Sequence, residues 1–517
     1  MSAPRTSRRW YGTAAAVLLC LAHFSSFDYR DQALVTDVRY YVYFAWRVTE
    51  GDVPHRDYFD NKTQLASLTG ALLHRLGEGL GADPLGAMRV GYLGLTAAGG
   101  MLAYLIHRRL GGDRCAAGLL GLLAYCSFGL LGTLASVGNT PKLLMALGAS
   151  AAALLACRGR WFWAGVVGAL SFMDWQIGAL VWLSAFVTAW VFGRPRGRAT
   201  LAVVGGGAAG MAPFLLYFAT QGALREAVAQ TIVASFVRGS AAGQRVDPGD
   251  RLALMDRLVG SACPGQTWLF YLGLAGMAIA AGWLWRGRGG ERQRLLVPLA
   301  VYHFGLVAFS LLDFQGYGDL FALLHSVAFF LAVLWISIHA WLVTRLDAAA
   351  GRRGAWIASV ASCLLAGALA RPGPLRPPIE LDGRPVIGTG TTLADQRAVA
   401  EAIRREVEGQ TLAFLEHCEL PFLMRRANAL PLAYWNHPAW AHFRRSPAES
   451  PIDTSIRMLD AVGAEVVVYP RRPWAAGYAS HTRQDRIVKF ESATGAYDVS
   501  LVLRAAASAT EERAAAP

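Results

Sequence analysis

Lysine and charged side chains in general are scarce in this chain of 517 residues. Charged residues make up 16% of the chain, against about 25% in an average soluble domain. Only three of the 49 basic side chains are lysines, namely Lys62, Lys142 and Lys489. The hydrophobic share is 54% and the mean hydropathy is +0.33. This balance excludes an ordinary soluble enzyme and predicts an integral membrane protein.

Cysteine is also sparse, and the seven residues show neither a CxxC pair nor metal-ligand spacing. We therefore expect isolated small core residues and no disulfide framework. No internal repeat of solenoid or transporter-half length is present. The net charge of +13 could suggest nucleic acid, but the arginines stand in short clusters between apolar runs, as topology signals do.

Apolar runs long enough, or nearly long enough, to cross a bilayer predict about eleven membrane spans. The N-terminal run follows Arg5, Arg8 and Arg9 without a small-residue cleavage site, so we expect an uncleaved first helix. The runs are 11–27, 88–107, 114–134, 141–157, 160–173, 176–193, 199–219, 265–286, 295–312, 320–344 and 354–370. The runs 160–173 and 176–193 are short, and a helical hairpin that does not fully cross is the alternative.

Arginine clusters fall on the N-terminus and on alternate connections, which predicts a cytoplasmic N-terminus in a bacterial cytoplasmic membrane. The long first loop, residues 28–88, then faces outward. So do the turns at Asn139 and Asp174 and the segment from Asp313 to Asp319. Polar residues capable of chemistry thus converge on the outer face.

The pattern changes after Ala370, where RPGPLRPPIELDGRP is rich in proline. We expect the membrane domain at 1–373, a small outer α/β domain at 374–505 and a disordered tail at 506–517. Within the α/β domain, residues 392–408 have helical spacing. Strands are expected at 412–415, 464–469 and 497–503.

The first loop holds a candidate catalytic carboxylate, Asp37, followed by Arg39, Tyr40 and Tyr41 with amphipathic helical spacing. Such a carboxylate could take a proton from an acceptor hydroxyl or hold a divalent ion. An interfacial helix with a solvated aspartate and an aromatic belt is the alternative.

The same loop continues as GDVPHRDYFDNKTQ from Gly51. Arg56 and Lys62 flanked by Asp57 and Asp60 suit a phosphate group, because arginine can grip two oxygens while lysine supplies a point charge. A salt-bridged turn without a ligand fits the same spacing.

The run D-x-x-Y-Y-x-x-x-A-x-x-x-x-x-G-x-x-P-x-R-D-Y-F-D-N-K, from Asp37 to Lys62, resembles the first outer loop of GT-C membrane glycosyltransferases. Bacterial relatives of protein O-mannosyltransferases and of lipid A aminoarabinose transferases, close to glycosyltransferase family 39, are the most similar. The resemblance implies a GT-C-like helical fold, a catalytic role for Asp37 and a donor-phosphate role for Lys62. Thr63, Gln64 and Leu65 depart from the prolines that usually follow this lysine.

Many members of that superfamily carry a second acid in the second outer loop, where this chain has Asn139, followed by Lys142. The absence of that acid leaves a bound divalent metal open, and Lys142 can supply positive charge to the phosphate. A snorkelling helix end is the alternative for Lys142. A late polar turn supplies further candidates for the lipid-phosphate pocket: Gln315, Tyr317, Asp319 and His325.

The expected activity is therefore inverting transfer of a sugar from a polyprenyl-phosphate donor to a lipid, glycan or protein acceptor. Catalysis is assigned to Asp37 and Asp57. Phosphate binding is assigned to Lys62, Arg56, Lys142 and His325. The substrate pocket is assigned to Tyr40, Asp60, Asn139, Gln315, Tyr317 and Asp319. A transporter or lipid flippase and a non-catalytic lipid-binding scaffold remain as alternatives.

Overall fold

The computed structural model describes most of the chain. The described residues are 5–35, 37–140, 142–238, 248–263, 267–287, 290–312, 314, 317–370, 379–381, 384–387, 391–415, 417–432, 437–446, 448–469, 486–495 and 497–503. The expected domain boundary at 373 and the expected tail at 506–517 lie outside these residues.

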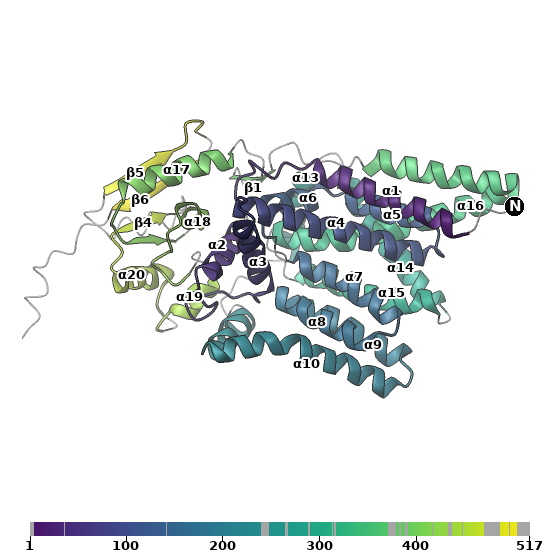
Figure 1. Cartoon of the computed structure of the whole chain (residues 1–517), viewed down its shortest axis with the longest axis horizontal. Coiled ribbons are helices and arrows are strands. Elements are labelled where there is room, and N and C mark those ends of the chain that lie inside the picture. The colour runs from purple at the N-terminus through teal and green to yellow at the C-terminus, as the bar shows by residue number, and fades with distance from the viewer. Residues whose placement is uncertain are drawn as a thin grey trace, which may run out of the picture.

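Helices account for the regular structure of the first 370 residues, and most of them run side by side in one bundle (Figure 1). The first group is α1 (Arg5–Ser25), α2 (Val38–Thr49), α3 (Leu65–Gly79), α4 (Pro84–Leu110), α5 (Cys115–Cys126), α6 (Gly129–Val137), α7 (Leu143–Cys157) and α8 (Trp161–Asp174). The second group is η1 (Gln176–Gly178), α9 (Ala179–Phe192), α10 (Arg196–Thr220), α11 (Leu224–Val228), η2 (Ala229–Arg238), α13 (Pro248–Ala262), α14 (Thr267–Arg286), α15 (Glu291–Leu312) and α16 (Tyr317–Ala370).

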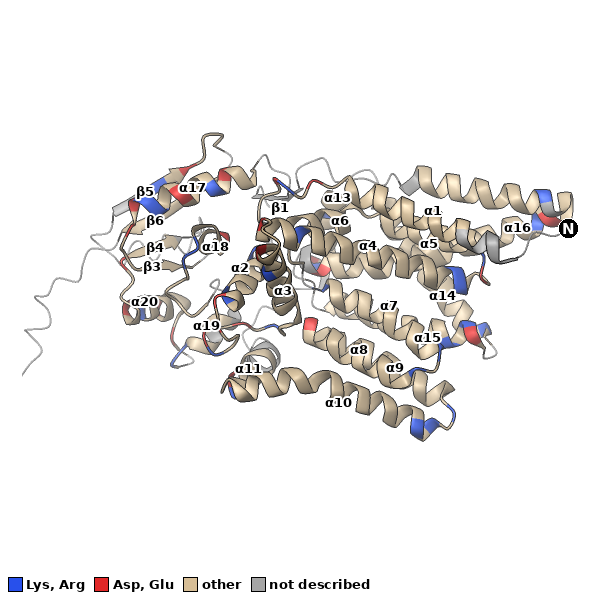
Figure 2. Cartoon of the chain, viewed as in Figure 1, with Lys and Arg blue, Asp and Glu red and all other residues tan. Residues whose placement is uncertain are grey.

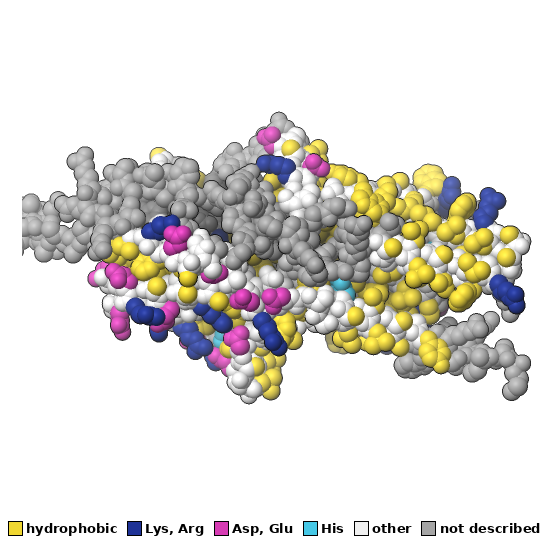
Figure 3. Space-filling model, turned by 90° about the horizontal axis from the view of Figure 1, so that it is seen from above, with side chains coloured by type: hydrophobic (Ala, Val, Ile, Leu, Met, Phe, Trp, Pro, Cys, Tyr) yellow, Lys and Arg dark blue, Asp and Glu magenta, His cyan; other side chains and the backbone are white. Residues whose placement is uncertain are grey.

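Five helices in the described part of the chain are long and apolar enough to cross a membrane, and a bent pair raises the number to six. Four shorter apolar helices have 10–17 residues. The bundle is therefore that of a multi-pass membrane protein, and the count of eleven spans stays a prediction. Charged side chains are almost absent along these helices and gather at the two ends of the bundle (Figure 2). In the space-filling view the bundle side of the molecule is largely yellow (Figure 3).

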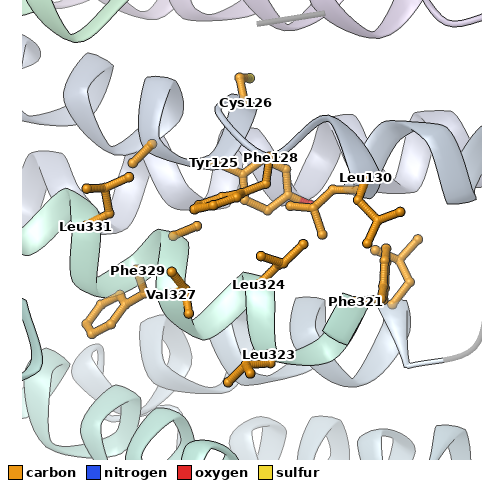
Figure 4. Close-up of a cluster of buried hydrophobic side chains, with 14 of the residues drawn as sticks. Tyr125, Cys126, Phe128, Leu130, Phe321, Leu323, Leu324, Val327, Phe329 and Leu331 are labelled. Carbon is orange, nitrogen blue, oxygen red and sulfur yellow. The ribbon is translucent and has the colours of Figure 1, made fainter. Parts of the chain in front are cut away.

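The apolar run 114–134 does not form one straight helix, because α5 and α6 meet at a bend of 59°. Phe128 at the bend has an extended backbone and is 1% exposed. It belongs to the same buried cluster as Phe321 and Leu324 of α16 (Figure 4). Hydropathy is equally high on both sides of the bend, so the sequence could not reveal it.

The two predicted spans 320–344 and 354–370 correspond to two helices, which share the label α16 and are separated by a kink at Gly351. Gly351 has φ of +59°, a backbone conformation that glycine adopts without the Cβ clash of other residues. The kink is where the two predicted spans are joined.

The helices α2 and α3 lie at the end of the bundle that meets the C-terminal residues, here called the domain-side end (Figure 1). One face of α3 is apolar and exposed: Leu72, Leu76 and Leu80 are 60%, 51% and 82% exposed. An exposed stripe at i, i+4 and i+8 is typical of a helix that lies in a membrane interface.

The C-terminal unit, residues 391–503, contains a four-stranded sheet in the order β3-β4-β6-β5. Its elements are α17 (Leu393–Glu406), β3 (Leu412–Phe414), α18 (Glu419–Met424), α19 (His437–Phe443), α20 (Pro451–Ala461), β4 (Val466–Tyr469), β5 (Arg486–Glu491) and β6 (Asp498–Leu503). The strand pair β3 and β4 is parallel, and the other pairs are antiparallel. A two-stranded ribbon precedes the unit, formed by β1 (Ile379–Leu381) and β2 (Arg384–Ile387).

Both faces of the sheet are buried, because side chains that alternate along the strands pack into two different hydrophobic clusters. Leu412, Phe414 and Val466 pack with Ile403 of α17. The neighbours on the opposite face pack with residues of α20. The predicted strands at 412–415, 464–469 and 497–503 are present within one or two residues, whereas β5 was not expected.

The first loop is part of this unit's packing. Phe59 lies in the cluster that covers the α20 face of the sheet. The amide of Phe59 donates to the carbonyl of Pro431 at 2.7 Å. Gln396 of α17 donates to the carbonyl of Leu34 and accepts from its amide, at 3.0 and 2.8 Å. The loop that carries the candidate site is therefore held between the bundle and the C-terminal unit.

Candidate functional site

The segment from His55 to Gln64 is held in place by side chains from much later in the chain. Gln230 of η2 accepts from the amide of Asp60 at 3.0 Å and donates to the carbonyl of His55 at 2.9 Å. Gln176 donates to the carbonyl of Asn61 at 2.7 Å. These contacts fix the backbone that leads to Lys62, and Gln230 Oε1 also lies 3.1 Å from His55 Nδ1. Neither glutamine was expected from the sequence, because each contacts residues more than 100 positions away in the chain.

Lys142 occupies the N-terminus of α7 and forms a buried ion pair with Asp319 at the start of α16. The distance from Lys142 Nζ to Asp319 Oδ1 is 2.6 Å, and the two side chains are 7% and 12% exposed. Lys142 has φ of +72°, which is uncommon for a residue with a Cβ. The same ammonium lies 4.1 Å from the centroid of the Trp175 ring. The predicted alternative of a snorkelling helix end does not fit a lysine that is 5% exposed.

Lys62 lies in the electrostatic field of this pair. Burial and the nearby Lys142 ammonium lower the pKa of Lys62, while Asp319, Asp37 and Asp60 oppose that change. The structure thus brings together Lys62, Lys142, Asp37, Asp60 and Asp319, which come from four separate parts of the sequence. Two like charges held close in a partly buried site favour an anion between them.

Asp37 is the exposed member of this cluster. It stands at the N-terminus of α2, yet its side chain does not cap that helix. Its carboxylate is therefore open to a reactant from the solvent side and close enough to Lys62 to stabilise the charged form of that lysine. A carboxylate in this position can accept a proton from a bound hydroxyl.

Asp60 is 4% exposed and differs from Asp37 in environment. Its carboxylate accepts from the amide of Lys62 at 2.9 Å and from Gln64 Nε2 at 2.8 Å. Burial raises the pKa of Asp60 to about 7 despite these hydrogen bonds. Asp60 shapes the turn that presents Lys62.

Arg56 and Asp57 form a separate pair at the surface. Arg56 Nε and Nη2 each donate to an oxygen of Asp57 at 2.9 Å. The amide of Val53 also donates to Asp57 at 2.7 Å. The guanidinium of Arg56 holds the pKa of Asp57 below its usual range. These two predicted site residues are bound to each other and do not appear among the charges that act on Lys62.

The remaining predicted pocket residues that the structure describes are Asn139 and Tyr40. Asn139 is fully buried and its Nδ2 donates to the carbonyls of Tyr41 and Ala66, so it joins α2 to α3. Tyr40 accepts a hydrogen bond from Arg39 at 3.0 Å. Gln315 lies outside the described residues, as does the side chain of Tyr317.

His325 packs between the rings of Tyr125 and Phe321, at centroid distances of 5.4 and 5.0 Å. It follows Asp319 by six positions on α16, or about 9 Å of helix. With His107 and His303 it lines a cavity of about 30 Å³ inside the bundle. The structure therefore places His325 deeper than the two lysines.

A second polar cluster, not among the predicted site residues, joins α2 to the C-terminal unit. Glu419 accepts from Tyr497 Oη at 2.8 Å, lies 3.0 Å from His417 Nδ1 and accepts from Arg39 at 3.4 Å. Burial opposes ionisation, but Arg39 and His417 lower the pKa of Glu419 to about 2. Arg39 follows Asp37 by two positions, so this cluster anchors the start of α2.

The described residues offer no group of three His, Cys, Asp or Glu side chains placed to hold one metal ion. Asp319 is committed to its ion pair with Lys142. The side chains present do not fit a divalent metal centre, so no step below passes through a metal ion.

The fold is similar to that of several solved structures. ArnT from Cupriavidus metallidurans in the apo state matches with a TM-score of 0.56 and 14% identity, over 98% of this chain and 99% of that chain. The chain has the ArnT fold. ArnT bound to undecaprenyl phosphate matches with a TM-score of 0.56 and 13% identity, over 97% of this chain and 99% of that chain.

The Archaeoglobus fulgidus oligosaccharyltransferase, in a complex with zinc and sulfate, matches with a TM-score of 0.50 and 12% identity, over 88% of this chain and 67% of that chain. No protein-family model and no curated protein sequence matches the chain. ArnT and the oligosaccharyltransferase are GT-C glycosyltransferases, so the predicted resemblance is confirmed by the fold.

Proposed function

We propose that the chain transfers a sugar from a polyprenyl-phosphate-linked donor to an acceptor hydroxyl. The observation that carries this proposal is the cluster of Lys62, Lys142 and Asp37 at the domain-side end of the bundle. Two of the chain's three lysines meet there, although nothing in a membrane bundle requires them. ArnT has been solved with undecaprenyl phosphate, which supports a polyprenyl phosphate donor.

In this mechanism the donor phosphate binds between Lys62 and Lys142. Asp37 accepts the proton of the acceptor hydroxyl as its oxygen attacks the anomeric carbon. The bond from that carbon to the phosphate oxygen breaks, and polyprenyl phosphate leaves with its charge stabilised by the two ammonium groups. Attack opposite the leaving group inverts the anomeric configuration.

Asp319 and Trp175 then act as positioning residues. Asp319 holds the Lys142 ammonium at 2.6 Å, and the centroid of the Trp175 ring lies 4.1 Å from the same ammonium. Arg56 and Asp57 are engaged with each other, so proton transfer is assigned to Asp37 alone. His325 lies too deep in the bundle for a direct phosphate contact in this arrangement and would border the lipid tail.

The proposed location is the outer face of a bacterial cytoplasmic membrane, with a cytoplasmic N-terminus. Arginine clusters lie at the bundle end opposite the C-terminal unit (Figure 2), which is the pattern of the positive-inside rule. The C-terminal unit would then lie outside the cytoplasm and contribute to acceptor binding.

The test is release of polyprenyl phosphate by the full-length protein in lipid nanodiscs, supplied with a panel of polyprenyl-phosphate sugars and a membrane extract as acceptor. The variants are Asp37→Asn and, as a matched surface control, Asp347→Asn. We expect release with wild type and the control and a loss of at least 100-fold with Asp37→Asn, in line with the contribution of a general base. Equal release with Asp37→Asn would remove Asp37 from catalysis, and no release by wild type would favour the transporter or scaffold alternative.

A further inference from the structure

A polar cavity of about 210 Å³ lies where α2, α3 and the start of α4 meet the C-terminal unit. About 10–15 Å³ of such space holds one water molecule, so the cavity has room for a much larger ligand. The charged groups in its lining are the carboxylates of Glu50, Glu78 and Asp83 and the guanidiniums of Arg397 and Arg425.

His74 of α3 supplies a buried polar atom without a partner in this cavity. It is 4% exposed, and its Nδ1 makes no hydrogen bond with any described residue. The nearest acid, Glu78, is 3.7 Å away, which is too far for a hydrogen bond. Burial lowers the pKa of His74, which favours the neutral ring. A ligand that bonds to this nitrogen removes the free-energy cost of leaving a buried polar atom unsatisfied.

Two further side chains of the lining have unused capacity. Glu50 and Arg425 are exposed, and their side chains form no ion pair or hydrogen bond with a described residue. Asp83 Oδ2 accepts from the amide of Gly86 at 2.9 Å, whereas Asp83 Oδ1 and Arg397 Nη2 lie 3.8 Å apart, too far for a hydrogen bond. The cavity thus presents strong acceptors and strong donors together.

Aromatic surface completes the lining. Trp46 and Phe422 both border the cavity, with ring centroids 6.4 Å apart and an edge-to-face angle of 77°. A ligand that matches this lining has closely spaced groups that both donate and accept, together with some apolar surface. Sugar rings meet this requirement, because every hydroxyl can do both.

The orientation of α3 favours a sugar over a phospholipid head group as the ligand of this cavity. His74 and Glu78 lie on the face of α3 opposite Leu72, Leu76 and Leu80, at 100° per residue. The leucine face is the one that suits the membrane interface. The cavity therefore opens away from the lipid and towards the C-terminal unit, where a lipid head group does not reach.

From this geometry we infer that the cavity binds a saccharide unit of the acceptor, away from the reacting hydroxyl. The assignment of this saccharide to the acceptor rests on the proposed function, whereas the binding of a saccharide does not. Trp46 follows Asp37 by nine positions of α2, or about 13 Å. The unit bound here is thus not the one that reacts, and its binding positions the reacting hydroxyl.

The experiment measures binding of glucose, N-acetylglucosamine and lactose to the full-length protein in nanodiscs by saturation-transfer NMR. Two changes remove the site: Glu78→Trp fills the cavity, and the double variant Glu50→Gln/Arg425→Asn removes the free charges. Asparagine is chosen because Arg425 has φ of +51°. Arg405→Gln, an exposed change elsewhere in the C-terminal unit, is the control.

We expect at least one of the three sugars to bind wild type and the control at millimolar concentration. Binding should be at least tenfold weaker in both cavity variants, which should elute as folded protein in size-exclusion chromatography. The inference is overturned if no sugar binds wild type, or if binding is unchanged in Glu78→Trp.

Polyprenyl phosphate release, measured on the same preparations, separates the two proposals. Release without any saccharide binding would overturn the cavity inference alone. Saccharide binding that depends on Glu50 and Arg425, without release from any donor, would support a saccharide site and overturn the transferase.

Discussion

Replacing Lys142 by methionine tests the central ion pair of the site. Methionine is an unbranched side chain one atom shorter than lysine and carries no charge, so Asp319 is left unpaired in a site where its side chain is 12% exposed. Breaking a buried pair by removing one partner costs about 3–5 kcal/mol, because the remaining charge loses its compensation. Asp319→Asn should cost less, because the Trp175 ring still lies 4.1 Å from the Lys142 ammonium.

The double variant Lys142→Met/Asp319→Asn completes a mutant cycle. We expect it to lose less stability than the sum of the single variants, with a coupling of about 2–3 kcal/mol. The assay is the apparent melting temperature in one detergent at one protein concentration. A double variant whose loss equals the sum, within about 0.5 kcal/mol, would refute the reasoning that the two charges depend on each other.

The two single variants should change the affinity for polyprenyl phosphate in different ways. Lys142→Met should weaken polyprenyl phosphate binding at least tenfold, or about 1.4 kcal/mol. Asp319→Asn frees the Lys142 ammonium for the phosphate, so binding should be equal or tighter. Fluorescence titration with polyprenyl phosphate in nanodiscs checks both, and a parallel loss in both variants would contradict the phosphate role.

Three further predictions concern protonation and the link to the C-terminal unit. Burial and Lys142 lower the pKa of Lys62. A bound phosphate favours the charged lysine, so donor binding should weaken as the pH rises through that lowered pKa. Lys62→Arg stays charged and should abolish this pH dependence in the same fluorescence titration. The pKa of Asp60 is raised to about 7 in the folded protein, whereas the same carboxyl in the unfolded chain loses its proton near pH 4. The contribution of Asp60 to the free energy of unfolding is therefore greatest below pH 4 and falls by up to about 4 kcal/mol as the pH rises to 7. In Asp60→Asn, the melting temperature should depend less on pH over that range. Glu419→Gln should reduce kcat without altering the donor Kd, because it loosens the start of α2 through Arg39; an unchanged kcat would count against this anchoring role.

Much of the architecture follows from composition and periodicity. Apolar length, arginine spacing and the change in pattern after Ala370 predict a membrane bundle followed by a small α/β unit, since hydropathy and strand alternation are local properties of the chain. The break at Gly351 falls between two predicted spans, whereas the bend between α5 and α6 escapes prediction, because it depends on what packs against an apolar run.

The candidate site was likewise predicted in part from the sequence and in part determined by the fold. The sequence by itself determined that Asp37 and Lys62 share one polar loop and that lysines are too rare to be topology signals. Only the tertiary structure decided that Lys142 turns inward to Asp319, and that Arg56 and Asp57 bind each other. The physical reason is that residue type and spacing determine what a side chain can do, whereas the pairing of buried charges depends on which elements the fold brings within a few ångströms.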